Sequence, residues 1–306
     1  MGQFIDMVSG APLFDFSERY SRMKYGSVPD IEWMGAKIAR SFIGRLNDPA
    51  DNLIRLFQNA ECAGEFVTVI SPASRNVESA QKRMVEIAVR HIDIWLALHG
   101  LPTMILAKLS RFRSGTTDYA RMSYSERIKD NTDPGVNRQY LPEPDFFAAG
   151  THVFFFDDIH VTGASAEQIG RIAMARGAKS FSTVFCVALD PKIVAENPGV
   201  EDRLNRSFIH GCLDEHVAAI LNQDGFMPVQ KMLRLLLDGK NRTTLAAFLR
   251  SSIHDDALLK LYASCLGNDY LRDSRFTDSV FILMNTLKES GLIGTDGLPH
   301  LDRMKT

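Results

Sequence analysis

The spacing of apolar residues changes twice along the chain of 306 residues. In residues 1–61, apolar side chains recur three and four positions apart, which predicts helices. Between residues 62 and 190, short apolar runs alternate with longer stripes of helical spacing, a pattern typical of β–α–β units in a parallel sheet. After Asp190 the spacing is helical again. We therefore expect a helical N-terminal region (1–61), an α/β core (62–190) and an all-α C-terminal domain (191–306).

The central zone predicts strands and helices in alternation. The expected strands are Phe66–Ile70 and residues 103–107, 153–156 and 183–189, and the run at 153–156 is apolar throughout, as in a strand buried on both faces. A helix is expected over residues 165–176, ended by Gly177. The helix before residue 100 is expected to bury one stripe, formed by Val77, Ala80, Met84, Ile87, His91, Trp95 and Leu98.

Composition narrows the class of protein. The chain is 45% hydrophobic and 24% charged with a formal net charge of −2, which is ordinary for a soluble globular protein and supplies no general field for nucleic acid. No run is apolar enough for a membrane span, and the N-terminus lacks the pattern of a secretion signal. The four cysteines are far apart, without a Cys-x-x-Cys pair, and predict reduced thiols and a cytoplasmic location.

Residues 153–165 combine groups that suit a sugar phosphate. Four apolar residues lead into Asp157 and Asp158, at the carboxyl end of a strand, where parallel sheets bind ligands. The following Val161, Thr162, Gly163, Ala164 and Ser165 stand at the start of a helix, where main-chain N–H groups, hydroxyls and a glycine form a phosphate cradle. Because like charges repel, the acids suit ribose hydroxyls or a hydrated Mg²⁺ instead.

This run resembles the motif with which type I phosphoribosyltransferases bind 5-phosphoribosyl-1-diphosphate (PRPP). The shared pattern is four apolar residues, two acids, three variable positions, Thr-Gly, any residue, and Thr or Ser, and every position matches. The resemblance implies a parallel-sheet α/β fold with an N-terminal helical hood and a C-terminal all-α domain. It also implies that Asp157 and Asp158 hold the ribose hydroxyls and Mg²⁺, and that Val161 to Ser165 hold the 5-phosphate.

The same resemblance suggests where the diphosphate is held. Ser74 and Arg75 lie in the loop at 71–76, and Lys108 follows the strand expected at 103–107, where family members place diphosphate-binding residues. In such proteins an unusual peptide bond often occurs in that loop, and Ser71–Pro72 is the candidate here for a cis bond. The alternative readings are a capped turn with Asn76 as the helix N-cap, and a solvated basic loop after Lys108.

Residues 108–150 show no clear period, and a loop of this length in a compact domain is usually functional or partly structured. It occupies the place of the mobile flap that shields an oxocarbenium-like transition state from water. Within it, residues 122–131 resemble the Leu-Ser-x-x-Glu-Arg-x-x-x-Asn stretch of ComF-like phosphoribosyltransferases. Residues 20–26 are similar to the hood segment of the same relatives, although an amphipathic surface helix or turn is the favoured interpretation.

The same residues allow other interpretations. Two acids and a Ser N-cap can form an ordinary solvated turn. Gly163-Ala-Ser165 begins like the Gly-x-Ser-x-Gly motif of a hydrolase elbow, but the fifth position is Glu167 and not glycine. The ligand-type residues between His210 and His216 have no zinc spacing and fit a helix face better. His160 is expected to be a solvent-exposed variable position that can touch a substrate phosphate.

The function that the resemblance implies is Mg²⁺-dependent transfer of ribose 5-phosphate from PRPP to a nitrogen nucleophile, with release of diphosphate. The alternative is a non-catalytic PRPP sensor, and the third class is an α/β domain with an accidental match. The expected partners are PRPP and an unidentified acceptor, without nucleic acid or membrane, and a homodimer is compatible with the sequence.

Overall fold

The structure is a computed structural model that describes residues 4–6, 12–13, 16–72, 74, 76–107, 125, 150–189, 191–196 and 199–300. The chain divides into two compact units, each built from several segments. The first comprises Met1–Phe16, Ile31–Arg75 and Gln81–Arg203, and the second comprises Ser17–Asp30, Asn76–Ala80 and Leu204–Thr306. The division into three sequence zones remains a prediction.

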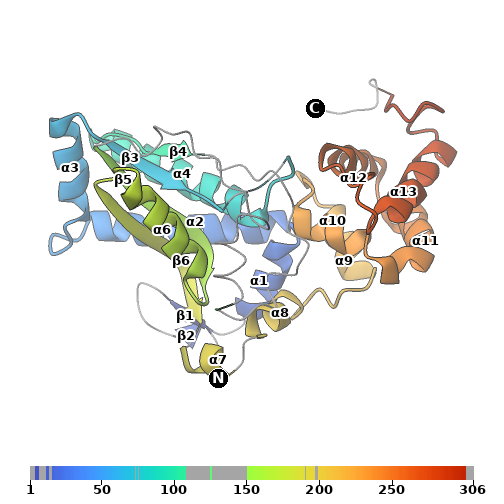
Figure 1. Cartoon of the computed structure of the whole chain (residues 1–306), viewed down its shortest axis with the longest axis horizontal. Helices are drawn as coiled ribbons and strands as arrows, with labels where there is room; N and C mark the ends of the chain where they lie inside the picture. The colour runs from blue at the N-terminus through green and yellow to red at the C-terminus, as the bar shows by residue number, and fades with distance from the viewer. Residues whose placement is uncertain are drawn as a thin grey trace. The chain divides into compact units, whose positions relative to one another are not determined.

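The first unit is built on one sheet with the strand order β2-β1-β6-β5-β3-β4 (Figure 1). Strands β6, β5, β3 and β4 are parallel, and β1 and β2 add an antiparallel edge beyond β6. This confirms the predicted parallel α/β fold. The strands are β1 (Phe4–Asp6), β2 (Pro12–Leu13), β3 (Phe66–Ile70), β4 (Ile105–Ala107), β5 (Thr151–His160) and β6 (Ser180–Leu189).

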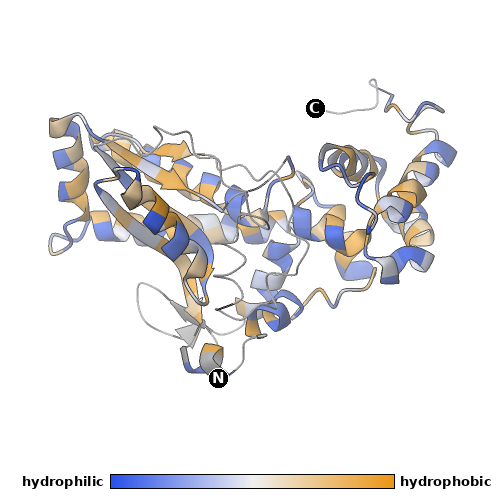
Figure 2. Cartoon of the chain, viewed as in Figure 1, coloured by the Kyte–Doolittle hydropathy of each residue, from blue (hydrophilic) through white to orange (hydrophobic). Residues whose placement is uncertain are grey.

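Helices cover both faces of this sheet. On one face, α6 (Ala164–Ala175) packs on a core that includes Val153 and Phe155 of β5. On the other face, Phe42 of α2 (Val28–Leu46) lies 5.5 Å from Phe154 and 5.7 Å from Phe156, measured between ring centroids. The run 153–156 of β5 is therefore buried on both faces, as its sequence predicted, in a sheet that Figure 2 colours largely as hydrophobic. The remaining helices of the unit are α3 (Leu53–Ala63), α4 (Ala80–Leu98) and α7 (Pro191–Glu196).

A glycine allows α6 to approach the sheet closely. A Cβ atom at Gly170 would lie 2.8 Å from the ring of Phe181 on β6. Alanine cannot be accommodated at that distance unless the helix or the ring moves. The position of α6, and with it the start of this helix, therefore depends on the small residue at 170.

The amino ends of three strands are joined by polar side chains. The Glu65 carboxylate contacts the Lys179 ammonium and lies 3.1 Å from His152 Nε2. The other ring nitrogen of His152, Nδ1, lies 2.8 Å from Ser180 Oγ. The Lys179 ammonium is the main cause that lowers the pKa of Glu65, with a smaller contribution from His152. The network links the starts of β3, β5 and β6 through side chains.

The second unit is all helical apart from an isolated β-bridge, within the residues that the structure describes. Its N-terminal segment contains most of α1 (Phe16–Lys24), and α8 (Val200–Asn205) enters it from the first unit. The other helices are α9 (Glu215–Leu221), α10 (Gln230–Leu236), α11 (Arg242–Ser252), α12 (Asp255–Gly267) and α13 (Thr277–Glu289). None of the helices in the described part of the chain is both long and apolar enough to cross a membrane.

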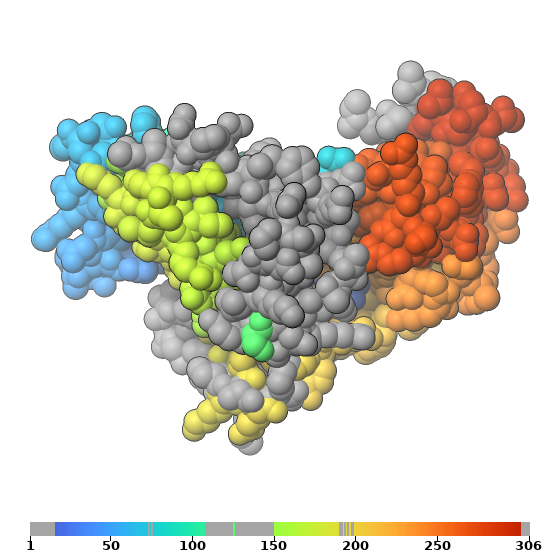
Figure 3. Space-filling model, viewed as in Figure 1, coloured from blue at the N-terminus to red at the C-terminus, as the bar shows by residue number. Residues whose placement is uncertain are grey.

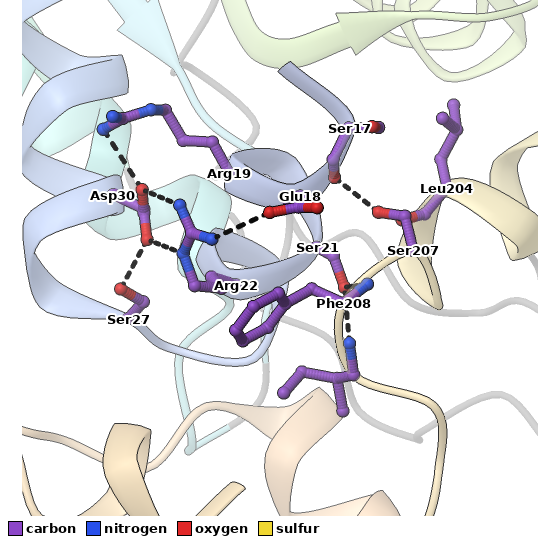
Figure 4. Close-up of polar contacts among 11 residues, drawn as sticks. Ser17, Glu18, Arg19, Ser21, Arg22, Ser27, Asp30, Leu204, Ser207 and Phe208 are labelled. Atoms are coloured by element: carbon purple, nitrogen blue, oxygen red, sulfur yellow. Dashed lines mark hydrogen bonds and ion pairs between the residues drawn. The ribbon is translucent and has the colours of Figure 1, made fainter. Parts of the chain in front are cut away.

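Buried polar contacts hold the N-terminal segment of the second unit (Figure 4). Arg22 Nε donates to Asp30 at 2.8 Å, and Arg19 pairs with the same carboxylate at 3.2 Å. The Ser21 hydroxyl donates to the main-chain oxygen of Asn205 at 2.7 Å and accepts from the N–H groups of Phe208 and Ile209. Because Asp30 and Ser21 are buried, we expect these contacts to be important for the fold of this unit.

Two expectations from the sequence are corrected. The stripe expected on α4 is wrong in its C-terminal half, because His91 and Leu98 are exposed while Ile92 and Leu96 are buried. Strands β1 and β2 were not expected in a helical zone. Each is three residues or fewer, too short to show an alternating pattern in sequence.

Candidate functional site

The acidic pair lies inside a strand and not after it. Strand β5 continues to His160, and Asp157 pairs with Phe185 of β6. Since successive side chains of a strand point to opposite faces, Asp157 shares the face of Val153 and Phe155, which α6 covers. Asp158 shares the face of Phe154 and Phe156. The sequence predicted one turn that carries both acids, whereas the strand separates their directions.

The two carboxylates also differ in exposure. Asp158 is only 2% exposed, and its Oδ1 accepts the main-chain N–H of Ile159 at 2.8 Å. Asp157 is half-buried, and its Oδ1 accepts the N–H of Asp158 at 2.8 Å. Asp157 is therefore the more accessible acid, and it lies on the same side of the sheet as the helix that follows.

The segment after β5 turns sharply into α6. Gly163 is the N-cap of this helix and has a left-handed backbone with φ of 71°, which glycine adopts at little cost. Its carbonyl accepts the Glu167 N–H at 2.9 Å, the first bond of the helix. Val161, Thr162 and Ser165 are half-buried around this turn, and Ala164 is buried. The turn thus presents a helix N-terminus, which favours anions.

The outer side of α6 is open to solvent. This helix forms the yellow-green surface in Figure 3, and the exposed side chains on it include Glu167, Arg171 and Met174. Its inner side buries Ile169 and Ala173. Packing against the sheet therefore fixes the position of α6.

His160 has a place that the sequence did not predict. It is the last residue of β5, and its ring lies edge-on to Phe185 with 4.9 Å between centroids. Its Nε2 would lie 3.1 Å from a Cβ atom at Gly163. The imidazole is half-buried, and burial lowers its pKa. His160 is therefore packed against the turn, where a solvent-exposed side chain was expected; the only signal in the sequence is its spacing of three from Gly163.

The diphosphate-binding residues are only partly described. Ser74 is 6% exposed, whereas Arg75 and Lys108 lie outside the described residues. The Ser71–Pro72 bond is trans, since the described residues contain no cis peptide bond, so the expected cis bond is wrong. Asn76 precedes α4 by four positions and donates to the carbonyl of Gly267, so it does not cap this helix.

The other motifs fall in different parts of the chain. Residues 122–131 lie outside the described residues except Ser125. Residues 20–26 belong to the second unit, with Tyr20 and Met23 fully buried. Asp214 is the N-cap of α9 and accepts the Val217 N–H at 3.1 Å, so the helix starts at Glu215 and the helix face expected over residues 210–216 is wrong for residues 210–214.

The parallel α/β sheet and the strand–turn–helix at 153–175 define a phosphoribosyltransferase-type fold. The family model described as "PRTase ComF-like" matches residues 6–283. The chain therefore belongs to the ComF-like phosphoribosyltransferase family, which confirms the family expected from the motif. Searches of curated proteins and of solved structures found no match to this chain.

Proposed function

We propose that this protein is a Mg²⁺-dependent phosphoribosyltransferase that moves ribose 5-phosphate from PRPP to a nitrogen nucleophile. The observation that carries the proposal is the turn at Gly163. A left-handed glycine starts a helix at the carboxyl end of the parallel strand that carries Asp157 and Asp158. Membership of a phosphoribosyltransferase family supports the same activity. The acceptor is a base or an amine.

The roles divide along the motif. Val161, Thr162, Gly163, Ala164 and Ser165 bind the 5-phosphate at the start of α6, because a helix N-terminus stabilises negative charge. Asp157 accepts hydrogen bonds from the ribose hydroxyls on the same side of the sheet, whereas Asp158, buried on the other face, supports the site through its bond to the Ile159 N–H. Ser74, Arg75 and Lys108 steady the diphosphate, where cations stabilise the charge that develops on the leaving group.

The donor set fits Mg²⁺. Mg²⁺ keeps several waters and is usually bound by one or two carboxylates together with substrate oxygens. Asp157 supplies the one accessible carboxylate of the pair and would act through water or through the ribose hydroxyls, whereas Asp158 is buried on the opposite face. When bound, the metal supplies charge neutralisation on the diphosphate.

In the transfer step a bond forms between the acceptor nitrogen and the anomeric carbon. The bond from that carbon to the diphosphate oxygen breaks, and diphosphate leaves with the electron pair. The nitrogen loses its proton to solvent, and no side chain of the chain is assigned as a general base. Asp157 and the phosphate turn hold the ribose still, which lowers the entropic part of the barrier.

Donor binding is tested by thermal unfolding with and without Mg²⁺ and PRPP. At a ligand concentration of a hundred times the Kd, binding adds about 2.7 kcal/mol to the stability. We expect this shift in the wild type and its loss in the Asp157→Asn/Asp158→Asn double variant. No shift in the wild type would end the proposal.

Transfer is tested separately, by release of diphosphate against a panel of nitrogenous bases and amines. Release that depends on one acceptor supports the enzyme, whereas tight binding without release from any of them supports the sensor. We also propose a cytoplasmic location, because the four cysteines form no disulfide.

A further inference from the structure

The loop at 71–76 begins in the first unit and ends in the second. It follows directly after β3 of the first unit. Its last residue, Asn76, opens a short segment of the second unit, Asn76–Ala80, after which the chain returns to the first unit. This loop carries Ser74 and Arg75, two of the residues proposed to steady the diphosphate. The second unit therefore holds one end of the loop on which the diphosphate depends.

Three consecutive residues of this segment form hydrogen bonds within the second unit. The Val77 N–H donates to Asn268 Oδ1 at 3.1 Å in a buried position. The Asn76 side-chain amide donates to the main-chain oxygen of the last residue of α12. The Glu78 carbonyl accepts the N–H of Gln230, the first residue of α10, at 3.3 Å. Two of these three bonds come from the end of α12, so this helix end is the main anchor of the segment.

The end of α12 is shaped to hold Asn268 in place. Asn268 is the C-cap of this helix, and the next residue, Asp269, has a left-handed backbone with φ of 62°. The Tyr270 N–H donates to the Cys265 carbonyl at 3.0 Å, and the Asp269 N–H donates to the Leu266 carbonyl at 2.9 Å. These two bonds form a Schellman motif, in which glycine is the usual left-handed residue. The motif fixes the main chain around Asn268, which is only 2% exposed.

The bond from Val77 to Asn268 is the one that the segment can least afford to lose. Val77 is buried and lies before the start of α4, so its N–H is outside the helix and donates to the Asn268 oxygen instead. A buried main-chain N–H needs an acceptor, and it is costly to leave one without a partner. Removal of the Asn268 oxygen is therefore expected to shift or loosen the main chain at Val77.

We propose that Asn268 is a positioning residue for the diphosphate of PRPP. It holds the main chain just after Arg75, and a displacement of about 1 Å in a positioning group can cost as much as 100-fold. The assignment rests on the proposed function, and it gives the all-α second unit a part in the binding of PRPP. The turn at Gly163 is built from β5 and α6 of the first unit, so binding of the 5-phosphate should not depend on Asn268.

Calorimetry with the two halves of the donor separates the two ends of the site. The full chain is titrated in the presence of Mg²⁺ with diphosphate, with ribose 5-phosphate and with PRPP. Asn268→Ala should weaken the binding of diphosphate and PRPP by about 2- to 30-fold, the range for mutations that act on a site without touching its ligand. The binding of ribose 5-phosphate should be unchanged. A merely structural role would weaken the binding of all three ligands alike, or of none.

Asn222→Ala is the matched control. Asn222 is the C-cap of α9, and its Oδ1 accepts the His254 N–H at 2.9 Å, so the change removes the same kind of bond elsewhere in the second unit. It should alter the binding of none of the three ligands. Asn76→Ala removes only the other contact with the end of α12. It should weaken diphosphate binding by a smaller factor, and it provides the test if Asn268→Ala does not fold.

Several results would overturn the role of Asn268. One is diphosphate binding that is unchanged in Asn268→Ala, or in Asn76→Ala if the first variant does not fold. Another is an equal loss of diphosphate and ribose 5-phosphate binding, and a third is a loss of diphosphate binding in Asn222→Ala as large as in Asn268→Ala. In these cases the wild type still binds PRPP, so the proposed function stands. A wild type that binds none of the three ligands overturns the proposed function together with the role of Asn268.

Discussion

The two ends of the central strands are built from different kinds of contact. At the amino end, Glu65, Lys179, His152 and Ser180 are joined side chain to side chain across three strands. At the carboxyl end, Asp157 and Asp158 each accept a main-chain N–H of the next residue, and the chain turns through a left-handed glycine into α6. The amino end is arranged to tie strands together. The carboxyl end places acidic oxygens and a helix N-terminus at one edge of the sheet. These groups are better placed to bind a ligand than to stabilise the fold.

The largest expected effect is on the carboxyl end. Asp157→Asn keeps an Oδ1 acceptor for the Asp158 N–H but removes the charge that orients the ribose. Loss of hydrogen bonds to a charged group is worth about 1.5–3 kcal/mol, so the affinity for PRPP should fall by about 10- to 100-fold. Titration calorimetry with Mg²⁺ and PRPP measures it, and the melting temperature without ligand should hardly change. An equal loss of binding in Glu65→Gln would show that the two ends do not differ in role.

The next effect is expected at the glycine that turns the chain. Gly163→Ala places a side chain on a left-handed backbone, which costs about 1–2 kcal/mol. The new Cβ atom would also lie 3.1 Å from His160 Nε2. Chemical denaturation should show this loss, and PRPP binding should weaken with it. Gly44→Ala is the control, because its Cβ would meet nothing within 4 Å inside α2. That change should stabilise by about 0.5–1 kcal/mol.

A smaller effect concerns the coupling of His160 with Gly163. In a His160→Ala background the contact with a Cβ at position 163 is gone, while the backbone strain remains. Gly163→Ala should therefore cost less there than in the wild type, by about 0.5–1 kcal/mol, which is within the range for residues in contact. A double-mutant cycle from denaturant unfolding measures this difference. Strict additivity would mean that the imidazole does not restrain the turn.

Sequence reasoning predicted the sheet better than the site. The predicted strand Phe66–Ile70 matches β3. Apolar, β-branched runs of this kind are typical of strands that a parallel sheet buries on both faces. The stripe on α4 was wrong at His91 and Leu98, and Leu98 is exposed although its spacing and type favour burial. The opposite directions of Asp157 and Asp158 could not be predicted, because the end of a strand depends on pairing with β6 and not on local sequence.

The smallest expected effect is at the amino end and depends on pH. The pKa of Glu65 is lowered chiefly by the Lys179 ammonium and also by His152. A carboxyl with a lowered pKa in the folded state stabilises the fold above its unfolded pKa of about 4.3, and this contribution is lost as the pH falls through the lower folded value. Glu65→Gln should thus be less stable than the wild type at pH 7, and the difference should shrink below about pH 4.3. Urea unfolding at a series of pH values measures this difference in stability. The control is Glu61→Gln, at an exposed residue of α3. A difference that stays constant with pH would mean that the charge of Glu65 does not hold the strands together.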